Sequence, residues 1–223
     1  MALASLLPAR RMLAAAPKGD GRPVMLLPGL VNSDRSMALM RRYLTRLGYR
    51  AVGWGLGRNL GARAIGAEGE RLLAQVAKLH AETGEKITLV GVSLGGIMAR
   101  FVAHRRPDLV REVITVASPY AGDPRATRVW RQFQWLTGES LDSEHVIARR
   151  LEIAKPLPVP ATAIWSRSDG LVNGLICRAP EEPGLRCIEI RSGHLGVQVR
   201  PEVWRAIADV LGGVGTPPER SSD

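Results

Sequence analysis

The sequence predicts an α/β fold, with a mostly parallel sheet of about six strands, helices on both faces and a small helical cap insertion. Six short apolar runs have the length of buried strands, and helical patterns separate most of them. Between the fourth and fifth runs, a longer segment has a helical pattern and no strand. Because parallel strands need a crossover connection, usually a helix, this alternation favours parallel pairing.

The elements follow one another along the chain. The predicted strands are 24–27, 49–54, 87–90, 113–117, 161–165 and 185–190. Helical spacing of apolar residues predicts helices through Met37, Met40, Leu44 and Leu47, through Ile65, Leu72, Val76 and Leu79, over 94–106, and over 203–211 with Trp204, Ile207 and Leu211 on one face. Gly48, Gly84 and Pro107 end the first three helices, and Ser33 or Asp34 is expected to cap the first.

The predicted organisation is one domain with three additions. Residues 1–22 form an N-terminal extension, in which 2–16 are expected to form a marginal helix, and residues 23–211 form the domain. Residues 123–155 are predicted to be a cap inserted over one end of the sheet, and residues 212–223 a flexible tail. A chain of 223 residues is of ordinary size for one such domain.

Composition excludes several classes of protein. Hydrophobic residues make up 45% of the chain and charged residues 23%, which excludes disorder of the whole chain. The net charge is +10, and 27 of the 31 basic residues are Arg. This excess suits an anionic partner or solvated helix faces, and the scatter of the Arg residues favours the second. Aromatic residues, at 4%, are too few to stack on bases, so no nucleic-acid partner is expected.

Targeting signals and cysteines favour a cytoplasmic address. No apolar run approaches the ~20 residues needed to cross a bilayer. The apolar N-terminal residues lack the basic start of a secretory signal. Cys177 and Cys187 are too few for a disulfide scaffold or a four-thiolate metal site. A single disulfide between them stays an alternative, while free thiols suit the cytoplasm.

A serine between two glycines follows the third predicted strand. Residues 91–95 read Gly-Val-Ser-Leu-Gly, and a predicted helix begins directly after the serine. A sharp strand-to-helix turn pushes its central serine into a strained backbone conformation, and side chains two positions before and after it would collide. Such a turn presents the Ser93 hydroxyl at a helix N-terminus and at the carboxyl edge of the sheet, where ligands bind. Ser93 is therefore the candidate nucleophile.

A serine nucleophile needs a base, and His194 is the candidate among four histidines. It follows the sixth predicted strand directly, on a loop at the same sheet edge as Ser93. His104 lies three helical turns beyond Ser93, too far away to reach it. His80 suits a solvent-facing helix position, and His145 lies in the cap, where a substrate role stays open.

The base needs an orienting acid, and Asp169 is the candidate because it lies just past the fifth predicted strand. An Asp before Gly is also common in turns, and Asp123, after the fourth strand, is the competing acid. The chain order Ser93, Asp169, His194 matches the order nucleophile, acid, base of one hydrolase fold.

A tetrahedral intermediate also needs N–H donors for its oxyanion. The N–H of Leu94, which follows the nucleophile, is one candidate. The N–H of Leu30 is the other, in the turn after the first strand, where Gly29 lets the backbone approach closely. Apolar side chains predicted to contact the substrate are Val31, Trp130, Phe133 and Trp135. For the three aromatic residues, packing of the cap onto the body is the alternative.

These segments together resemble the α/β-hydrolase fold and, among its members, bacterial lipase- and esterase-like proteins. The resemblance covers residues 23–211 and is carried by 26–29, 91–96, 166–172 and 192–194. It implies Ser93 as nucleophile, Asp169 as acid and His194 as base, an oxyanion hole formed by Leu30 and Leu94, and a cap or lid formed by the insertion. Pro28 stands where many members have histidine, which leaves the N–H donors in place.

The resulting hypothesis is a serine carboxylic-ester hydrolase, an esterase or lipase, that acts on apolar acyl esters through an acyl-enzyme. It implies no metal and no organic cofactor. An acyltransferase or thioesterase with the same three residues is the alternative, and a non-catalytic membrane-binding protein on this scaffold is the third hypothesis. The expected partner is a small-molecule or lipid ester. Peripheral contact with a lipid surface and the oligomeric state stay open.

Overall fold

A computed structural model describes residues 6–214 apart from 129, 139 and 180. Its six strands are all parallel and lie in the order β2-β1-β3-β4-β5-β6. They are β1 (Pro23–Leu27), β2 (Arg50–Gly53), β3 (Ile87–Val92), β4 (Val110–Val116), β5 (Ala161–Trp165) and β6 (Leu185–Glu189). The predicted fold class is confirmed. Every residue of β1 and β3 is buried, as expected for strands covered on both faces.

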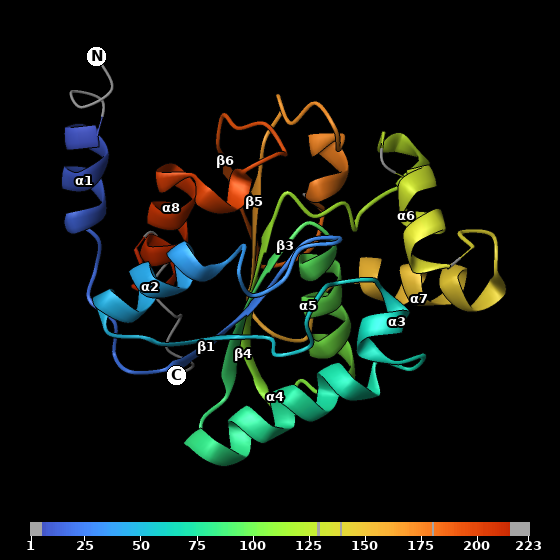
Figure 1. The fold of residues 1–223 in the computed structure, drawn as a ribbon, viewed down its shortest axis with the longest axis horizontal. Helices are drawn as coiled ribbons and strands as arrows, with labels where there is room; N and C mark the ends of the chain where they lie inside the picture. The colour runs from blue at the N-terminus through green and yellow to red at the C-terminus, as the bar shows by residue number, and fades with distance from the viewer. Residues whose placement is uncertain (1–5, 129, 139, 180, 215–223) are drawn as a thin grey trace.

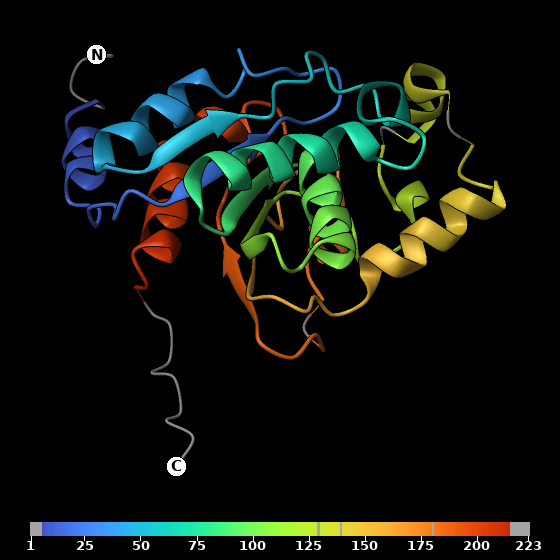
Figure 2. The same ribbon diagram turned by 90° about the horizontal axis from the view of Figure 1, so that it is seen from below.

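Helices cover both faces of this sheet (Figures 1 and 2). One face carries α1 (Leu6–Ala14), α2 (Ala38–Leu47) and α8 (Pro201–Leu211), and the other carries α4 (Glu70–Thr83) and α5 (Leu94–Arg105). Each layer has its own apolar cluster with the sheet. Met40 and Ile207 belong to the first cluster, and Leu72 and Phe101 belong to the second.

Helix α1 packs against α8. Arg205 of α8 donates to the carbonyl of Met12 (2.7 Å), and the hydroxyl of Tyr43 donates to the carbonyl of Leu13 (3.2 Å). The first residues of the helix expected over 2–16, and all but the first three of the expected tail, lie outside the described residues. Among the described residues, no helix has the length and apolar character needed to cross a membrane.

The predicted cap for α2 is wrong. Helix α2 begins at Ala38 with Met37 at its N-cap position, and no side chain caps it. The carboxylate of Asp34 instead accepts the backbone N–H groups of Trp54 (3.0 Å) and Gly55 (3.1 Å). Asp34 therefore holds the loop that follows β2, a pairing between distant segments that local spacing does not encode.

The predicted helix through Ile65 and Leu79 is two helices. Ile65 ends the short helix α3 (Ala62–Ile65), and α4 begins only at Glu70. Gly66 and Gly69 between them have φ values of 93° and 74°. This backbone conformation, which glycine adopts readily, breaks the helical path between the two apolar stretches.

Between β4 and β5, the described residues form helices and turns without a strand. The elements there are the 3₁₀ turn Pro124–Ala126, α6 (Trp130–Thr137) and α7 (Glu144–Ala154). Figure 1 shows α6 and α7 beyond α5, on the side away from the sheet, and α7 packs against α5. The fully buried Arg100 of α5 donates to the carbonyls of Ile153 (2.8 Å) and Lys155 (2.6 Å) at the end of α7. The segment is thus anchored to the helix that begins at the candidate nucleophile.

Candidate active site

Ser93 lies at the sharp turn between β3 and α5. Its φ of 52° and ψ of −120° are in a region that non-glycine residues avoid, at a typical cost of about 1–3 kcal/mol. Its N–H donates to the carbonyl of Val116 at 2.8 Å. A methyl group on Gly91 would overlap the backbone of Gly95, and one on Gly95 would overlap the carbonyl of Leu27. The turn therefore has room only for glycine at both positions.

The structure brings Ser93, His194 and Asp169 into one hydrogen-bonded chain. His194 Nδ1 lies 2.9 Å from Asp169 Oδ2, and His194 Nε2 lies 3.1 Å from Ser93 Oγ. An ionised carboxylate only accepts hydrogen bonds, so the neutral imidazole donates from Nδ1 and accepts the Ser93 hydroxyl at Nε2. The side chain of Asp169 is 2% exposed and that of His194 13%, which keeps water away from the Asp169 contact.

Backbone groups hold the carboxylate of Asp169 in place. Its Oδ1 accepts the N–H groups of Val172 (2.8 Å) and Leu171 (3.3 Å), which leaves Oδ2 for His194. The backbone N–H of His194 also donates to the carbonyl of Asp169 at 3.0 Å. The loops after β5 and β6 are therefore paired side by side, so the histidine is oriented by main chain as well as by side chain.

The turn after β1 passes directly over Ser93. A methyl group on Gly29 would lie 3.4 Å from Ser93 Cβ, so the two backbones are in close contact. Within the described part of the chain, the N–H groups of Leu30 and Leu94 donate to no protein acceptor. Leu94 is the first residue of α5, where an N–H is free and the helix dipole favours negative charge.

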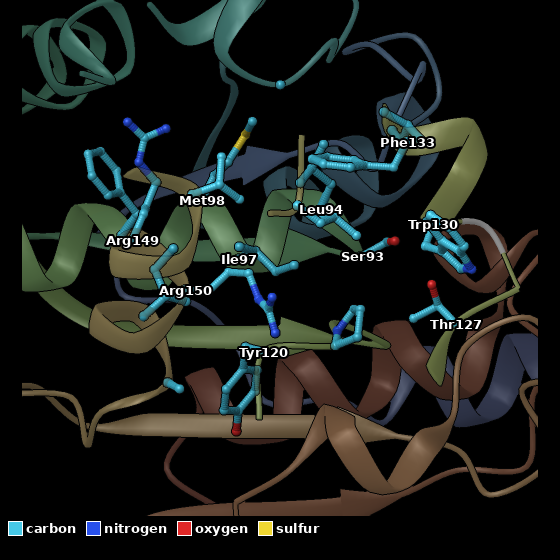
Figure 3. Close-up of a pocket in the computed structure, with 18 of the residues that line it drawn as sticks. Ser93, Leu94, Ile97, Met98, Tyr120, Thr127, Trp130, Phe133, Arg149 and Arg150 are labelled. Carbon is cyan, nitrogen blue, oxygen red and sulfur yellow. The ribbon is translucent and has the colours of Figure 1, made fainter. Parts of the chain in front are cut away.

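An apolar cavity of about 410 Å³ opens at Ser93 and runs between α5 and the cap. Figure 3 shows Phe133 of α6 above Ser93 and Trp130 of α6 beside it, with Ile97 and Met98 continuing along α5. The walls also include residues of α3, of α7 and of the loop after β4. The arrangement can enclose an extended apolar group next to the Ser93 hydroxyl.

Two residues predicted to contact the substrate lie outside the cavity lining. Trp135 is 81% exposed, because it is two positions from Phe133 and therefore on the opposite side of α6. Val31 is 44% exposed, and its N–H donates to the carbonyl of Asn59 (2.8 Å) rather than facing the cavity. The competing acid Asp123 accepts the N–H of Arg125 (2.9 Å) and has no contact with His194 among the described residues.

Other titratable groups near the site are not arranged for chemistry. Cys177 is buried and free, and burial, with the Asp169 carboxylate second, raises the pKa of its thiol. Burial, with Arg100 second, lowers the pKa of His104 on α5. Within the described ranges, no group of three or more His, Cys, Asp or Glu side chains could hold a metal ion.

Sequence reasoning missed two buried polar residues that shape the site. Ser166 Oγ accepts the N–H of Ser192 (3.1 Å) and joins the loop of the acid to the loop of the histidine. Asn59 contacts the turn over Ser93 from a glycine-rich loop that sequence alone marks only as a turn. No local pattern marks the contact of either residue, because the partner of each lies in a distant segment.

Comparisons with known proteins agree with this architecture. A family model described as "alpha/beta hydrolase fold" matches residues 69–157. A triacylglycerol lipase of Vibrio cholerae is 47% identical over 62 residues, which are 27% of this chain and 20% of the lipase. A triacylglycerol lipase of Pseudarthrobacter phenanthrenivorans is 46% identical over 55 residues, 24% of this chain and 17% of that lipase. The chain thus matches only about a fifth of the length of these relatives.

Solved structures match over most of the chain. A lipase of Bacillus licheniformis superposes with a TM-score of 0.63 at 16% identity, over 88% of this chain and 94% of the lipase. A monoacylglycerol lipase of Paleococcus ferrophilus superposes with a TM-score of 0.62 at 16% identity, over 89% of this chain and 96% of that enzyme. The chain therefore has the α/β-hydrolase fold and is similar to lipases and esterases.

Proposed function

We propose that the chain is a serine carboxylic-ester hydrolase that acts on apolar acyl esters. The observation that carries the proposal is the contact chain Ser93 Oγ–His194 Nε2 (3.1 Å) and His194 Nδ1–Asp169 Oδ2 (2.9 Å) at the mouth of an apolar cavity. A nucleophile, a base within hydrogen-bond distance and a group that orients the base are the parts that acyl transfer requires.

The first half of the reaction forms an acyl-enzyme. Ser93 Oγ attacks the ester carbonyl carbon while His194 Nε2 takes the hydroxyl proton, and Asp169 stabilises the resulting imidazolium. The carbonyl oxygen becomes an oxyanion, which the N–H groups of Leu30 and Leu94 bind. The intermediate then collapses, the alcohol leaves, and His194 returns the proton to it.

Water completes the cycle in the second half. His194 takes a proton from a water molecule, whose oxygen attacks the acyl carbon, and the bond to Ser93 Oγ breaks as His194 protonates the serine. The carboxylic acid leaves and the free enzyme returns. This scheme draws only on side chains and backbone groups of this chain and assigns no step to a cofactor.

The cavity supports acyl chains of medium length. Its floor follows one face of α5 through Leu94, Ile97, Met98 and Phe101. The eight steps along the chain from Ser93, at the N-cap of α5, to Phe101 span about 12 Å. An extended chain advances about 1.2 Å per bond, so roughly ten carbons fit along this face. We expect p-nitrophenyl esters of about eight to ten acyl carbons to be hydrolysed with the highest kcat/KM.

A larger side chain at Ile97 is expected to shorten the cavity. Ile97→Trp should lower kcat/KM for the decanoate ester at least tenfold, because the distal carbons lose their apolar contacts. The acetate ester should stay within about twofold of wild type. Leu39→Trp, at a 51% exposed aliphatic position on α2, is the matched control and should change neither rate. Equal losses on acetate and decanoate would contradict this assignment of the acyl site.

Contact of the cap with a lipid surface is a further part of the proposal. Trp135 on α6 is 81% exposed and Leu151 on α7 is 65% exposed, an unusual exposure for large apolar side chains. The net charge of +10 favours an anionic surface. A cap docked on such a surface would receive its ester substrate from the membrane.

Replacing Trp135 tests this contact. Trp135→Ser should lower partitioning onto anionic phospholipid vesicles about tenfold, because one large apolar side chain no longer enters the interface. Cosedimentation with vesicles measures the bound fraction. Leu39→Ser, which removes an exposed apolar side chain from α2, should leave binding unchanged. Equal vesicle binding by wild type and Trp135→Ser would contradict the proposal that the cap contacts the lipid surface.

Hydrolysis of p-nitrophenyl esters from acetate to palmitate, in the presence and absence of added alcohols and thiols, tests the reaction itself. We expect the free acid as the main product, with water as the acceptor. Acyl transfer to an added acceptor at the expense of hydrolysis would favour an acyltransferase instead. The cytoplasmic address stays part of the proposal and is supported by the free thiols of Cys177 and Cys187.

A further inference from the structure

Asn59 is a fully buried polar residue that contacts residues 28–32, the turn that passes over Ser93. Its Nδ2 donates to the carbonyl of Pro28 at 2.7 Å. Its backbone N–H donates to the carbonyl of Asn32 (2.8 Å), and its own carbonyl accepts the N–H of Val31 (2.8 Å). Asn59 therefore binds the turn both before and after Leu30, whose N–H is one of the two donors assigned to the oxyanion.

The amide of Asn59 has a defined orientation. A carbonyl can only accept, so the group that meets Pro28 is the NH₂, and Oδ1 in turn accepts the N–H of Gly61 at 3.2 Å. Nδ2 also lies 3.4 Å from the sulfur of Met98, a residue of α5 that lines the cavity. Both ends of the amide thus have partners, and the group is held between the turn, α5 and its own loop.

The turn that Asn59 holds is strained. Val31 has a φ of 57°, a conformation that a β-branched residue avoids. Such a conformation persists only where its surroundings impose it. The N–H of Val31 is bound to Asn59, and Asn32 closes the turn by donating to the carbonyl of Gly29 at 3.0 Å. The contacts of Asn59 supply that constraint.

We propose that Asn59 is a positioning residue for catalysis, which holds residues 28–31 so that the N–H of Leu30 points at the oxyanion that forms on the Ser93-bound carbonyl. It does not touch the substrate itself. The inference rests on the proposed ester hydrolysis, because it assigns the geometry of the oxyanion hole. A donor is effective only when its place is set before the charge develops, and displacement of the order of 1 Å can reduce a rate about a hundredfold.

Asn59→Ala removes the side-chain bonds to Pro28 and Gly61 but keeps both backbone bonds. We expect kcat for p-nitrophenyl octanoate to fall about 10–100-fold with KM within about twofold of wild type, because the oxyanion exists only in the transition state. The pH profile of kcat/KM should keep its shape, because Asn59 contacts neither His194 nor Asp169 among the described residues. Asn59→Ser, whose hydroxyl is too short to reach Pro28, replaces the alanine variant if that one does not fold.

An inhibitor that mimics the tetrahedral intermediate tests the geometry of the oxyanion hole directly. Ser93 Oγ adds to the carbonyl carbon of an octyl trifluoromethyl ketone, and the hydroxyl proton passes to His194. The former carbonyl oxygen becomes an oxyanion in the oxyanion hole. In Asn59→Ala, the inhibition constant of this ketone should rise in proportion to the loss of kcat/KM. The matched control is Thr88→Val, which removes the hydrogen bond that the fully buried Thr88 donates to the partly buried Glu112 (3.1 Å), at the far end of β3 from Ser93. It should lower the unfolding temperature similarly and leave kcat and the inhibition constant unchanged.

Labelling by a fluorophosphonate separates this inference from the proposed function. The probe forms a bond between Ser93 Oγ and phosphorus and expels fluoride, so it needs an active serine and an oxyanion hole but no particular ester. If wild type is labelled yet hydrolyses no ester, the proposed function fails, and the labelling rates of the Asn59 variants still decide the inference. Labelling and kcat within twofold of wild type would overturn the role of Asn59. A rise in KM alone, or a loss that Thr88→Val reproduces, would overturn it as well.

Discussion

Replacing Ser93 by alanine is expected to lower the turnover of every p-nitrophenyl ester at least about a thousandfold, because the acyl-enzyme cannot form without the hydroxyl. Removing one member of a cooperating triad abolishes what the others do, so the residual rate reflects only binding and the oxyanion donors. KM should change little, because the serine hydroxyl contributes little to ground-state binding. Steady-state kinetics on esters from acetate to palmitate measures the effect.

Two controls show that this loss is chemical. Ser36→Ala removes a serine hydroxyl that donates to the carbonyl of Ser33 (2.7 Å), before α2 and outside the cavity lining, and should leave turnover unchanged. The unfolding temperature of Ser93→Ala should stay close to that of wild type, because no buried partner is orphaned. If wild type and Ser93→Ala are equally inert on every ester, simple ester hydrolysis is wrong, and transfer to a specific acceptor or a binding role takes its place.

Replacing Arg100 by alanine is expected to destabilise the fold by about 3–5 kcal/mol. Its guanidinium forms an ion pair with Glu182 (3.1 Å), with side-chain exposures of 1% and 4%. It also lies 3.9 Å from the centre of the Tyr120 ring and donates to the carbonyls of Ile153 and Lys155. Its removal leaves a buried carboxylate without its charge partner and two carbonyls without donors. For a domain of this size, the unfolding temperature should fall by about 6–20 °C.

An exposed ion pair and a double variant serve as controls, which separate the loss of the charge partner from the loss of packing. Arg50→Ala removes the exposed ion pair with Glu82 (3.2 Å) and should cost less than about 1 kcal/mol. Arg100→Met combined with Glu182→Leu should recover much of the stability, because paired apolar side chains leave no uncompensated charge. A loss of only a few tenths of a kcal/mol in Arg100→Ala would contradict the assigned role. Activity on long esters should also fall in that variant, because α7, which Arg100 anchors, lines the cavity.

The strands and the placement of Ser93 were predictable because their signals are local. Unbroken apolar runs are what a strand between two helical layers requires, and β1 and β3 are such strands. The glycines around Ser93 mark the sharp turn in the sequence, although only the overlap of Gly91 with Gly95 lies within it, and that of Gly95 is with Leu27 of β1. The carboxyl ends of parallel strands meet at one sheet edge, so Asp169 and His194 were expected near Ser93 from their places after β5 and β6.

The directions in which side chains of the cap and the loops point could not be predicted as well from the sequence. Trp135 and Phe133 are both aromatic and close in sequence, which predicts a shared substrate contact, yet the helix turns them to opposite sides. The sequence predicts a substrate contact for Val31 and a helix cap at Ser33 or Asp34, whereas Val31 and Asp34 make hydrogen bonds with the segment that follows β2. Helix periodicity alone does not decide which face meets the body, because the surroundings of a cap are set by segments far away in the sequence.

The sequence by itself determined the α/β fold, the strands and the residue types that stand at the carboxyl edge of the sheet, because strand period and turn chemistry are local properties and helices between successive strands favour parallel pairing. Only the tertiary structure decided which polar groups are buried together. The Arg100–Glu182 pair joins residues 82 apart, and the Asn59–Pro28 contact joins residues 31 apart. Burial makes each unpaired polar atom costly, so these pairs form only when the whole chain brings their partners together.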